Sequence, residues 1–137
     1  MQLNNTTQYA IRILSYIAKN GDSRLYPAKE LSQKLDIPYK FLTKIMTELV
    51  NSNFVNSIKG RVGGYSLAKK ANEISVLDII DLYIDPETRK KCILGMGLCD
   101  DSNKCGLHDK WVNPRDLINE MYKNTTLDTL EQRASKI

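Results

Sequence analysis

A glycine-rich, basic segment at residues 59–64 restricts the possible folds of this chain more than any other feature. It reads KGRVGG and separates two β-type runs, at about 54–58 and 65–67. Glycine adopts positive φ angles without penalty and lets the backbone come close to another molecule. Two short β-type runs on either side of such a segment predict a β-hairpin with a basic tip.

Apolar residues recur at three- and four-residue steps before the hairpin, and this spacing predicts three amphipathic helices. They cover about residues 5–19, 27–35 and 38–51. About three residues join the second helix to the third, and the outer face of the third is polar and basic, which is typical of a helix-turn-helix. A helix-turn-helix followed by a hairpin is a winged helix, so we expect a mainly α fold with a small β-hairpin wing.

Further helix signals follow the hairpin. Ser75 and Asp78 match a capping box, which predicts that a helix begins there. Residues 86–108 show no sustained periodicity. We expect another helix to begin at Asn113-Pro114 and a short last helix to lie near the C-terminus.

The positive charge is concentrated in the winged part. Residues 38–70 hold six basic side chains and one acidic one, whereas residues 84–137 hold nine of each. A dense basic patch suits a polyanion such as DNA, although a solvated basic face would look the same. The adjacent helix and hairpin favour DNA, because one can enter the major groove and the other can reach the minor groove or a phosphate. The residues predicted to contact DNA are Tyr39, Lys40, Thr43 and Lys44 on the helix, and Lys59 and Arg61 on the wing.

Three cysteines and the single histidine of the chain lie close together in the sequence, at Cys92, Cys99, Cys105 and His108. An odd number of cysteines argues against a disulfide scaffold, and three thiolates with an imidazole make a ligand set for soft metals. Structural zinc sites use cysteine pairs two to four residues apart. The gaps of six and five residues here favour a loop around an iron–sulfur cluster. A zinc site and a loop of free thiols are the alternatives.

Several classes of protein are disfavoured. No apolar run is long enough to cross a bilayer, and the N-terminus has no secretory signal, so we expect a cytoplasmic protein with no membrane partner. The chain has no phosphate-cradling glycine motif and no nucleophile elbow, so we expect neither an enzyme nor a small-molecule substrate. A small electron-transfer protein would use the cysteines but would not need the basic hairpin.

The order of these parts resembles the Rrf-type family of winged-helix iron–sulfur transcription regulators. The resemblance rests on residues 7–10, 37–42, 59–67 and 74–80, on the three cysteines, and on residues 105–111 and 126–127. It implies a winged helix-turn-helix DNA-binding domain at 1–84, a cysteine-bearing loop at 85–108, and a long dimerisation helix with a C-terminal tail at 109–137. It further implies a homodimeric repressor that binds a palindromic operator and senses iron, nitric oxide or redox stress through its cluster.

The resemblance also assigns the cluster ligands. The three cysteines match the family's ligands, and His108 matches the fourth ligand of its iron–sulfur-biogenesis regulators. Nitric-oxide sensors of the family use an acidic residue where this chain has Gln8, so a [2Fe–2S] cluster is favoured over [4Fe–4S]. Pro114 lies where relatives have uninterrupted helix, which indicates a later start or a kink. A cluster-free or zinc-stabilised regulator acting by thiol oxidation is the alternative function.

Overall fold

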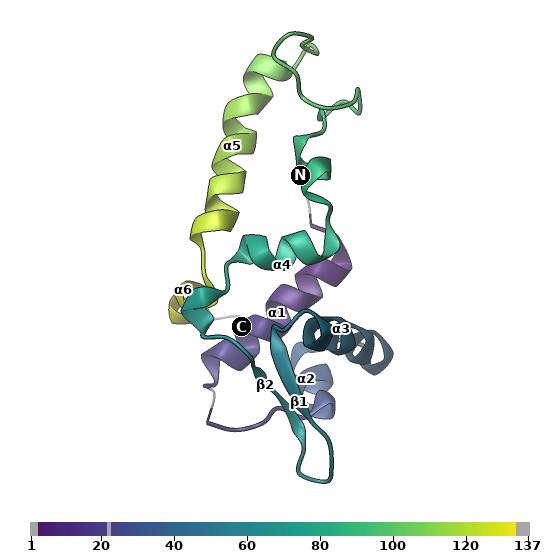
Figure 1. Ribbon diagram of the computed structural model, residues 1–137, viewed down its shortest axis with the longest axis vertical. Helices are drawn as coiled ribbons and strands as arrows, with labels where there is room; N and C mark the ends of the chain where they lie inside the picture. The colour runs from purple at the N-terminus through teal and green to yellow at the C-terminus, as the bar shows by residue number, and fades with distance from the viewer. Residues whose placement is uncertain (1–2, 22, 134–137) are drawn as a thin grey trace.

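The computed structural model describes residues 3–21 and 23–133, so the last four residues of the expected C-terminal tail lie outside it. The elements in chain order are α1 (Asn5–Lys19), α2 (Ala28–Leu35), α3 (Tyr39–Asn51), β1 (Val55–Ile58), β2 (Gly64–Leu67), α4 (Val76–Tyr83), α5 (His108–Asn124) and α6 (Leu127–Arg133), with short 3-10 turns at Ala71–Glu73 and Pro86–Lys90. The expected mainly α fold with a β-hairpin wing is confirmed. Figure 1 shows a lower body that carries the wing, with α5 and the cysteine-bearing loop extending above α4.

The core of the body is organised around α1. Its apolar face is fully buried at Ala10, Ile13, Leu14 and Ile17. This face packs against α2, α3, α4, α6 and the wing strand β2. The side chains of one amphipathic helix therefore hold the helix-turn-helix, the wing and the C-terminal helix in one structure. No helix in the described ranges is long and apolar enough to cross a membrane.

The wing is fastened to the start of α2 by its backbone. The N–H of Tyr26 donates to the Tyr65 carbonyl, and the N–H of Tyr65 donates to the Tyr26 carbonyl, each at 2.9 Å. Gly64 allows this approach, because a Cβ at that position would lie 2.8 Å from the backbone carbon of Tyr26. Gly63 has the same role inside the hairpin, where a Cβ would lie 2.1 Å from the Ile58 carbonyl oxygen.

Helix α4 begins as predicted. The hydroxyl of Ser75 accepts from the Asp78 N–H at 3.1 Å, and the Asp78 carboxylate accepts from the Ser75 N–H at 3.0 Å. The chain returns to this point after α5, since the Val76 N–H donates to the Thr125 carbonyl and the Leu127 N–H donates to the Ile74 carbonyl. The cysteine-bearing arm, residues 85–124, therefore leaves the body at the end of α4 and returns to it at the start of α4.

The predicted start of the next helix at Asn113-Pro114 is wrong. Helix α5 begins at His108 and runs through Pro114 to Asn124. The proline ring fixes φ at a helical value, but it removes the hydrogen bond to the carbonyl four residues earlier and crowds that carbonyl. That carbonyl belongs to Lys110, and both Lys110 and Pro114 are exposed, so the unpaired group lies on the solvent side of the helix.

We expect a Gly64→Ala substitution to lower the free energy of unfolding by about 1–3 kcal/mol, because the new methyl group overlaps the backbone at Tyr26. Gly106→Ala is the matched control, since a Cβ there has no neighbour within 4 Å among the described residues. Urea unfolding measures both. Equal stability of the two variants would contradict the assigned role of Gly64.

Candidate functional site

The predicted DNA-contacting side chains of α3 differ in availability. Tyr39 is 57% exposed, and Lys40 and Lys44 are also exposed. Thr43 is half-buried, and its hydroxyl donates to the Lys40 carbonyl at 3.1 Å. The two lysines and Tyr39 are therefore better placed to reach a ligand than Thr43.

A groove of about 440 Å³ runs between the wing and the beginnings of α2 and α3. It brings together Tyr39, Lys59 and Arg61 from the predicted set, whereas Lys40, Thr43 and Lys44 lie outside it. The structure adds Lys29, in the first turn of α2. Lys29 was not predicted, because the contacts expected from the sequence lie only on the helix at 38–51 and on the wing. Its position at the start of the first helix of a helix-turn-helix was the available signal.

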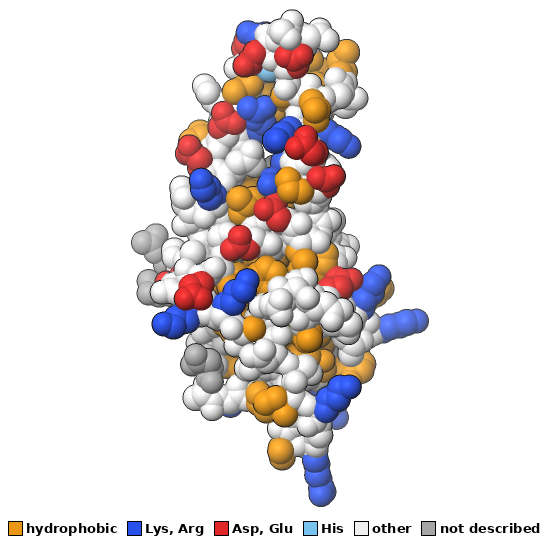
Figure 2. Space-filling view, in the orientation of Figure 1, with side chains coloured by type: hydrophobic (Ala, Val, Ile, Leu, Met, Phe, Trp, Pro, Cys, Tyr) orange, Lys and Arg blue, Asp and Glu red, His pale blue; other side chains and the backbone are white. Residues whose placement is uncertain are grey.

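The two ends of the molecule differ in net charge. In Figure 2, basic side chains project from the lower, wing-bearing part, whereas acidic and basic side chains are mixed over the upper part. This agrees with the net charge of +5 within residues 38–70 and the neutral balance of residues 84–137. A polyanion is therefore attracted to the end of the molecule that carries the groove.

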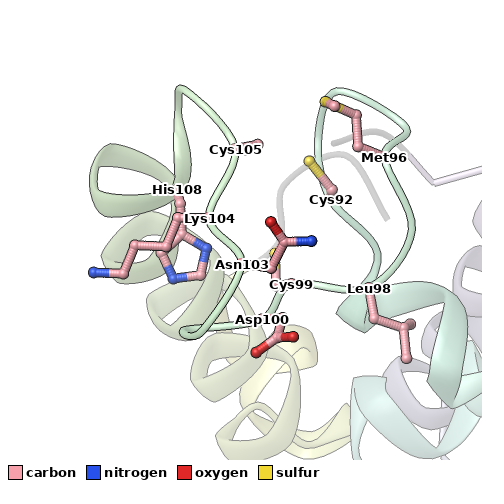
Figure 3. A pocket seen from close by; sticks show the side chains of 9 residues that line it. All are labelled: Cys92, Met96, Leu98, Cys99, Asp100, Asn103, Lys104, Cys105 and His108. Atoms are coloured by element: carbon pink, nitrogen blue, oxygen red, sulfur yellow. The ribbon is translucent and has the colours of Figure 1, made fainter.

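The three cysteines and His108 line a single small cavity of about 60 Å³ at the far end of the arm. Figure 3 shows that two stretches of the loop enclose it, with Cys92 on one and Cys105 and His108 on the other. An isolated antiparallel β-bridge between Lys91 and Leu98 closes the stretch that carries Cys92. The structure thus gathers all four predicted ligand residues around one space.

Cys92 lies in an environment that favours its thiolate. It is 7% exposed, and the Leu94 N–H donates to its sulfur at 3.4 Å. Backbone N–H groups of Met96 and Leu94, together with a hydrogen bond to Cys105, lower the pKa of the Cys92 thiol below its ordinary value. A thiol with a lowered pKa is both a better metal ligand and a more reactive nucleophile.

His108 begins α5 and is 4% exposed. Its Nε2 lies 2.8 Å from Asp101 Oδ1, and an ionised carboxylate can only accept, so Nε2 carries the proton. The lone pair of a neutral imidazole is then on Nδ1. Metal-binding histidines are commonly oriented in this way by a carboxylate on the other ring nitrogen. His108 was predicted from the sequence, whereas its partner Asp101 was not.

Cys99 is connected to α5. Its thiol donates to the Lys91 carbonyl at 3.8 Å. It also interacts with the Arg115 guanidinium, which forms an ion pair with Asp116 at 3.0 Å. Burial disfavours the charge of Arg115, but Asp116 and Cys99 outweigh it, so the pKa of Arg115 is raised. Cys99 therefore links the loop to the side of α5.

The donor set of this cavity fits an iron–sulfur cluster in its chemistry, because thiolates and an imidazole are the ligands that such clusters take. A single metal ion is a poorer match. Within residues 3–21 and 23–133, no group of three histidine, cysteine or acidic side chains is close enough to hold one ion. The observed spacing therefore does not form the tetrahedron of a structural zinc site.

Comparison with known proteins identifies relatives along the whole chain. The Rrf2 family, described as an iron-dependent transcriptional regulator, matches residues 3–133. A protein of Aquifex aeolicus assigned as an HTH-type transcriptional regulator is 37% identical over 132 residues, covering 95% of this chain and 91% of the relative. The HTH-type transcriptional regulator IscR of Cronobacter sakazakii is 28% identical over 130 residues, covering 95% and 80%.

Solved structures show the same fold. CymR of B. subtilis, described as the global cysteine regulator of that organism, has a TM-score of 0.82 at 22% identity, covering 98% of this chain and 99% of its own. IscR of T. potens has a TM-score of 0.72 at 20% identity, covering 98% and 89%.

A Cys105→Ala substitution should slow the alkylation of Cys92 at pH 7. Cys105 is one of the groups that lower the Cys92 pKa, so its loss raises that pKa and leaves less of the reactive thiolate at a given pH. The rate with iodoacetamide, followed by mass spectrometry across a pH series, measures the shift. Cys99→Ala is the control and should leave the pH dependence of Cys92 alkylation unchanged. If Cys105→Ala also leaves it unchanged, the contact between Cys92 and Cys105 is refuted.

Proposed function

We propose that this chain, which belongs to the Rrf2 family of transcriptional regulators, represses transcription as a homodimer. In this proposal, its binding to operator DNA depends on chemistry at the cysteine cavity. Members of this family regulate transcription by binding DNA and are not enzymes. The proposal has three parts, which are the residues that contact DNA, the iron–sulfur cluster and the dimer contact. The observation that supports the regulation most directly is that Cys92, Cys99, Cys105 and His108 all line one cavity.

The groove between the wing and the helix-turn-helix is the proposed DNA-binding surface. Lys29, Lys59 and Arg61 line it together with Tyr39, and cations of this kind bind phosphates or enter a narrow minor groove. Lys40, Thr43 and Lys44 lie on the helix that would enter the major groove, where side chains contact base edges. Phosphate contacts would position the protein, and the α3 side chains would read the sequence.

The cysteine cavity is the proposed site of an iron–sulfur cluster with Cys92, Cys99 and Cys105 as ligands and His108 Nδ1 as the fourth. When bound, such a cluster supplies a centre that responds to iron supply, oxidants and nitric oxide. Asp101 would hold the imidazole in the required tautomer, as the 2.8 Å contact with Nε2 supports. The imidazole ligand and the neutral Gln8 favour [2Fe–2S] over [4Fe–4S].

Direct thiol oxidation is the second candidate mechanism, and the contact between Cys92 and Cys105 favours it. Their two thiols would lose two protons and two electrons to an oxidant such as peroxide and form one disulfide. A structural neighbour, CymR of Staphylococcus aureus, has been solved in an oxidized form. That protein has a TM-score of 0.75 and 24% identity with this chain.

Helix α5 provides the proposed dimer contact. It packs against α4 on one side, and the apolar side chains of Leu117 and Met121 are 66% and 55% exposed. A second copy covering these side chains would bury them and would place two recognition helices on one DNA duplex. Two-fold symmetry then requires a palindromic operator.

Arg61→Ala should weaken binding to duplex DNA and reduce the dependence of log affinity on log salt by about one unit, the value for one lost phosphate contact. Lys44→Ala should also weaken binding. Lys123→Ala removes the same charge from the exposed end of α5 and serves as the control. Fluorescence anisotropy at several salt concentrations measures the effect. Equal affinities for Arg61→Ala and Lys123→Ala would exclude the wing from the interface.

Anaerobic purification followed by iron and sulfide analysis tests the cluster. We expect visible absorption with iron and acid-labile sulfide in equal amounts, and loss of both in Cys99→Ala, which should stay folded and dimeric. A colourless protein that binds no iron or sulfide after reconstitution would refute the cluster. Peroxide-dependent loss of DNA binding in such a preparation would establish thiol oxidation instead.

A further inference from the structure

Arg115 of α5 contacts a residue of the cysteine cavity without lining the cavity itself. It is a half-buried residue, and its side chain is 19% exposed. His108, which does line the cavity, lies seven residues earlier on the same helix. Seven residues make almost two full turns of an α-helix, so the two side chains share one face. The face of α5 that carries His108 at the cavity therefore also carries Arg115.

The guanidinium of Arg115 is shared between Asp116 and Cys99. The Asp116 carboxylate accepts from Nε at 3.1 Å and lies 3.0 Å from Nη2. A guanidinium has five N–H groups, so this pair leaves others that can donate elsewhere. Burial lowers the pKa of Arg115, but the hydrogen bonds and charges of Asp116 and Cys99 outweigh it and raise that pKa. A cation that is largely withdrawn from water therefore lies next to the Cys99 sulfur.

A second contact of Cys99 changes when this residue acts as a ligand. In this structure its thiol donates to the Lys91 carbonyl at 3.8 Å. A metal ligand is a thiolate, which has no proton to donate. The N–H groups of Arg115 can then donate to a negatively charged sulfur, and such charge-assisted hydrogen bonds are stronger than neutral ones. The backbone of Cys99 is held separately, because its N–H donates to the Lys90 carbonyl at 2.7 Å.

We propose that Arg115 is a positioning residue of the cysteine cavity, and that its guanidinium donates to the Cys99 sulfur and sets the charge around this ligand. This role rests on the proposed function, because Cys99 is a ligand of the proposed cluster. The reduction potential of an iron–sulfur cluster depends on net charge and on hydrogen bonds to its sulfurs. Reduction adds negative charge, so a nearby cation favours the reduced form. Arg115 therefore raises the potential at which the cluster is reduced.

The first test uses the reduced, cluster-free protein and two alkylating reagents. Iodoacetate is negatively charged and iodoacetamide is neutral, but both react with the same thiolate, so the ratio of their rates at Cys99 reports the nearby charge. Arg115→Gln keeps a donor amide but removes the charge. It should lower the iodoacetate-to-iodoacetamide ratio by about threefold to fivefold, as expected of one unit charge about 4 Å away in water. Arg115→Lys, which keeps the charge, should retain most of the ratio. Tandem mass spectrometry measures both rates.

Arg89→Gln is the matched control. Arg89 lies in the same arm, its side chain is 15% exposed, and it forms an ion pair with Asp81 of α4. This substitution removes the same charge from a comparably buried side chain, and it should leave the reagent ratio at Cys99 nearly unchanged.

The second test measures the reduction potential of the anaerobically loaded protein by a redox titration followed through visible absorption. Arg115→Gln should lower the potential by about 59 mV, which is a tenfold lower ratio of reduced to oxidised cluster at a fixed potential. Arg115→Lys should restore much of the shift, and Arg89→Gln should shift the potential much less.

The outcomes separate this role of Arg115 from the function on which it rests. If Arg115→Gln keeps the wild-type reagent ratio, the guanidinium does not act on the Cys99 sulfur and the proposed role is wrong, whether or not a cluster forms. A loaded Arg115→Gln protein with the wild-type potential, or an equal effect of Arg89→Gln, would also overturn it while the cluster stands. If the wild type takes up no cluster after reconstitution, the proposed cluster fails, and the reagent ratio alone decides whether Arg115 sets the charge at Cys99.

Discussion

The pair of backbone hydrogen bonds between Tyr26 and Tyr65 is the constraint on which the DNA-binding surface depends. It fixes the wing against the start of α2. It can form because Gly64 lacks a Cβ, which would otherwise overlap the backbone of Tyr26. A free two-stranded hairpin is marginally stable in water, so without this attachment the basic tip would have no fixed position. With it, residues from α2, α3 and the wing line one groove.

Helix α4 has the corresponding role for the arm. Its capping box fixes where α4 begins, and the hydrogen bonds to Thr125 and Leu127 beside that point fix where the arm returns. Helix α4 and the returning end of α5 therefore join the cysteine-bearing arm to the body that carries the groove.

Local signals in the sequence predicted much of this structure. Helical periodicity located α1, α2 and α3, the capping box located α4, and the glycines located the wing, because each depends on residues close in sequence. The start of α5 was missed because Pro114 is a strong local signal that a long exposed helix can nevertheless accommodate. Lys29 was missed although its place at the start of the helix-turn-helix was a local signal. The contact of Asp101 with His108 could not be predicted, since it depends on how the loop folds back in three dimensions.

The central claim is that the state of the cysteine cavity sets the affinity of the DNA-binding groove. The most direct test measures operator affinity of one anaerobic preparation at fixed salt, before and after its iron is removed by a chelator under reducing conditions. The account predicts an affinity change of about tenfold or more that accompanies the loss of iron and sulfide, within the usual range of coupling between two sites. An affinity that stays the same while iron and sulfide are lost would contradict it.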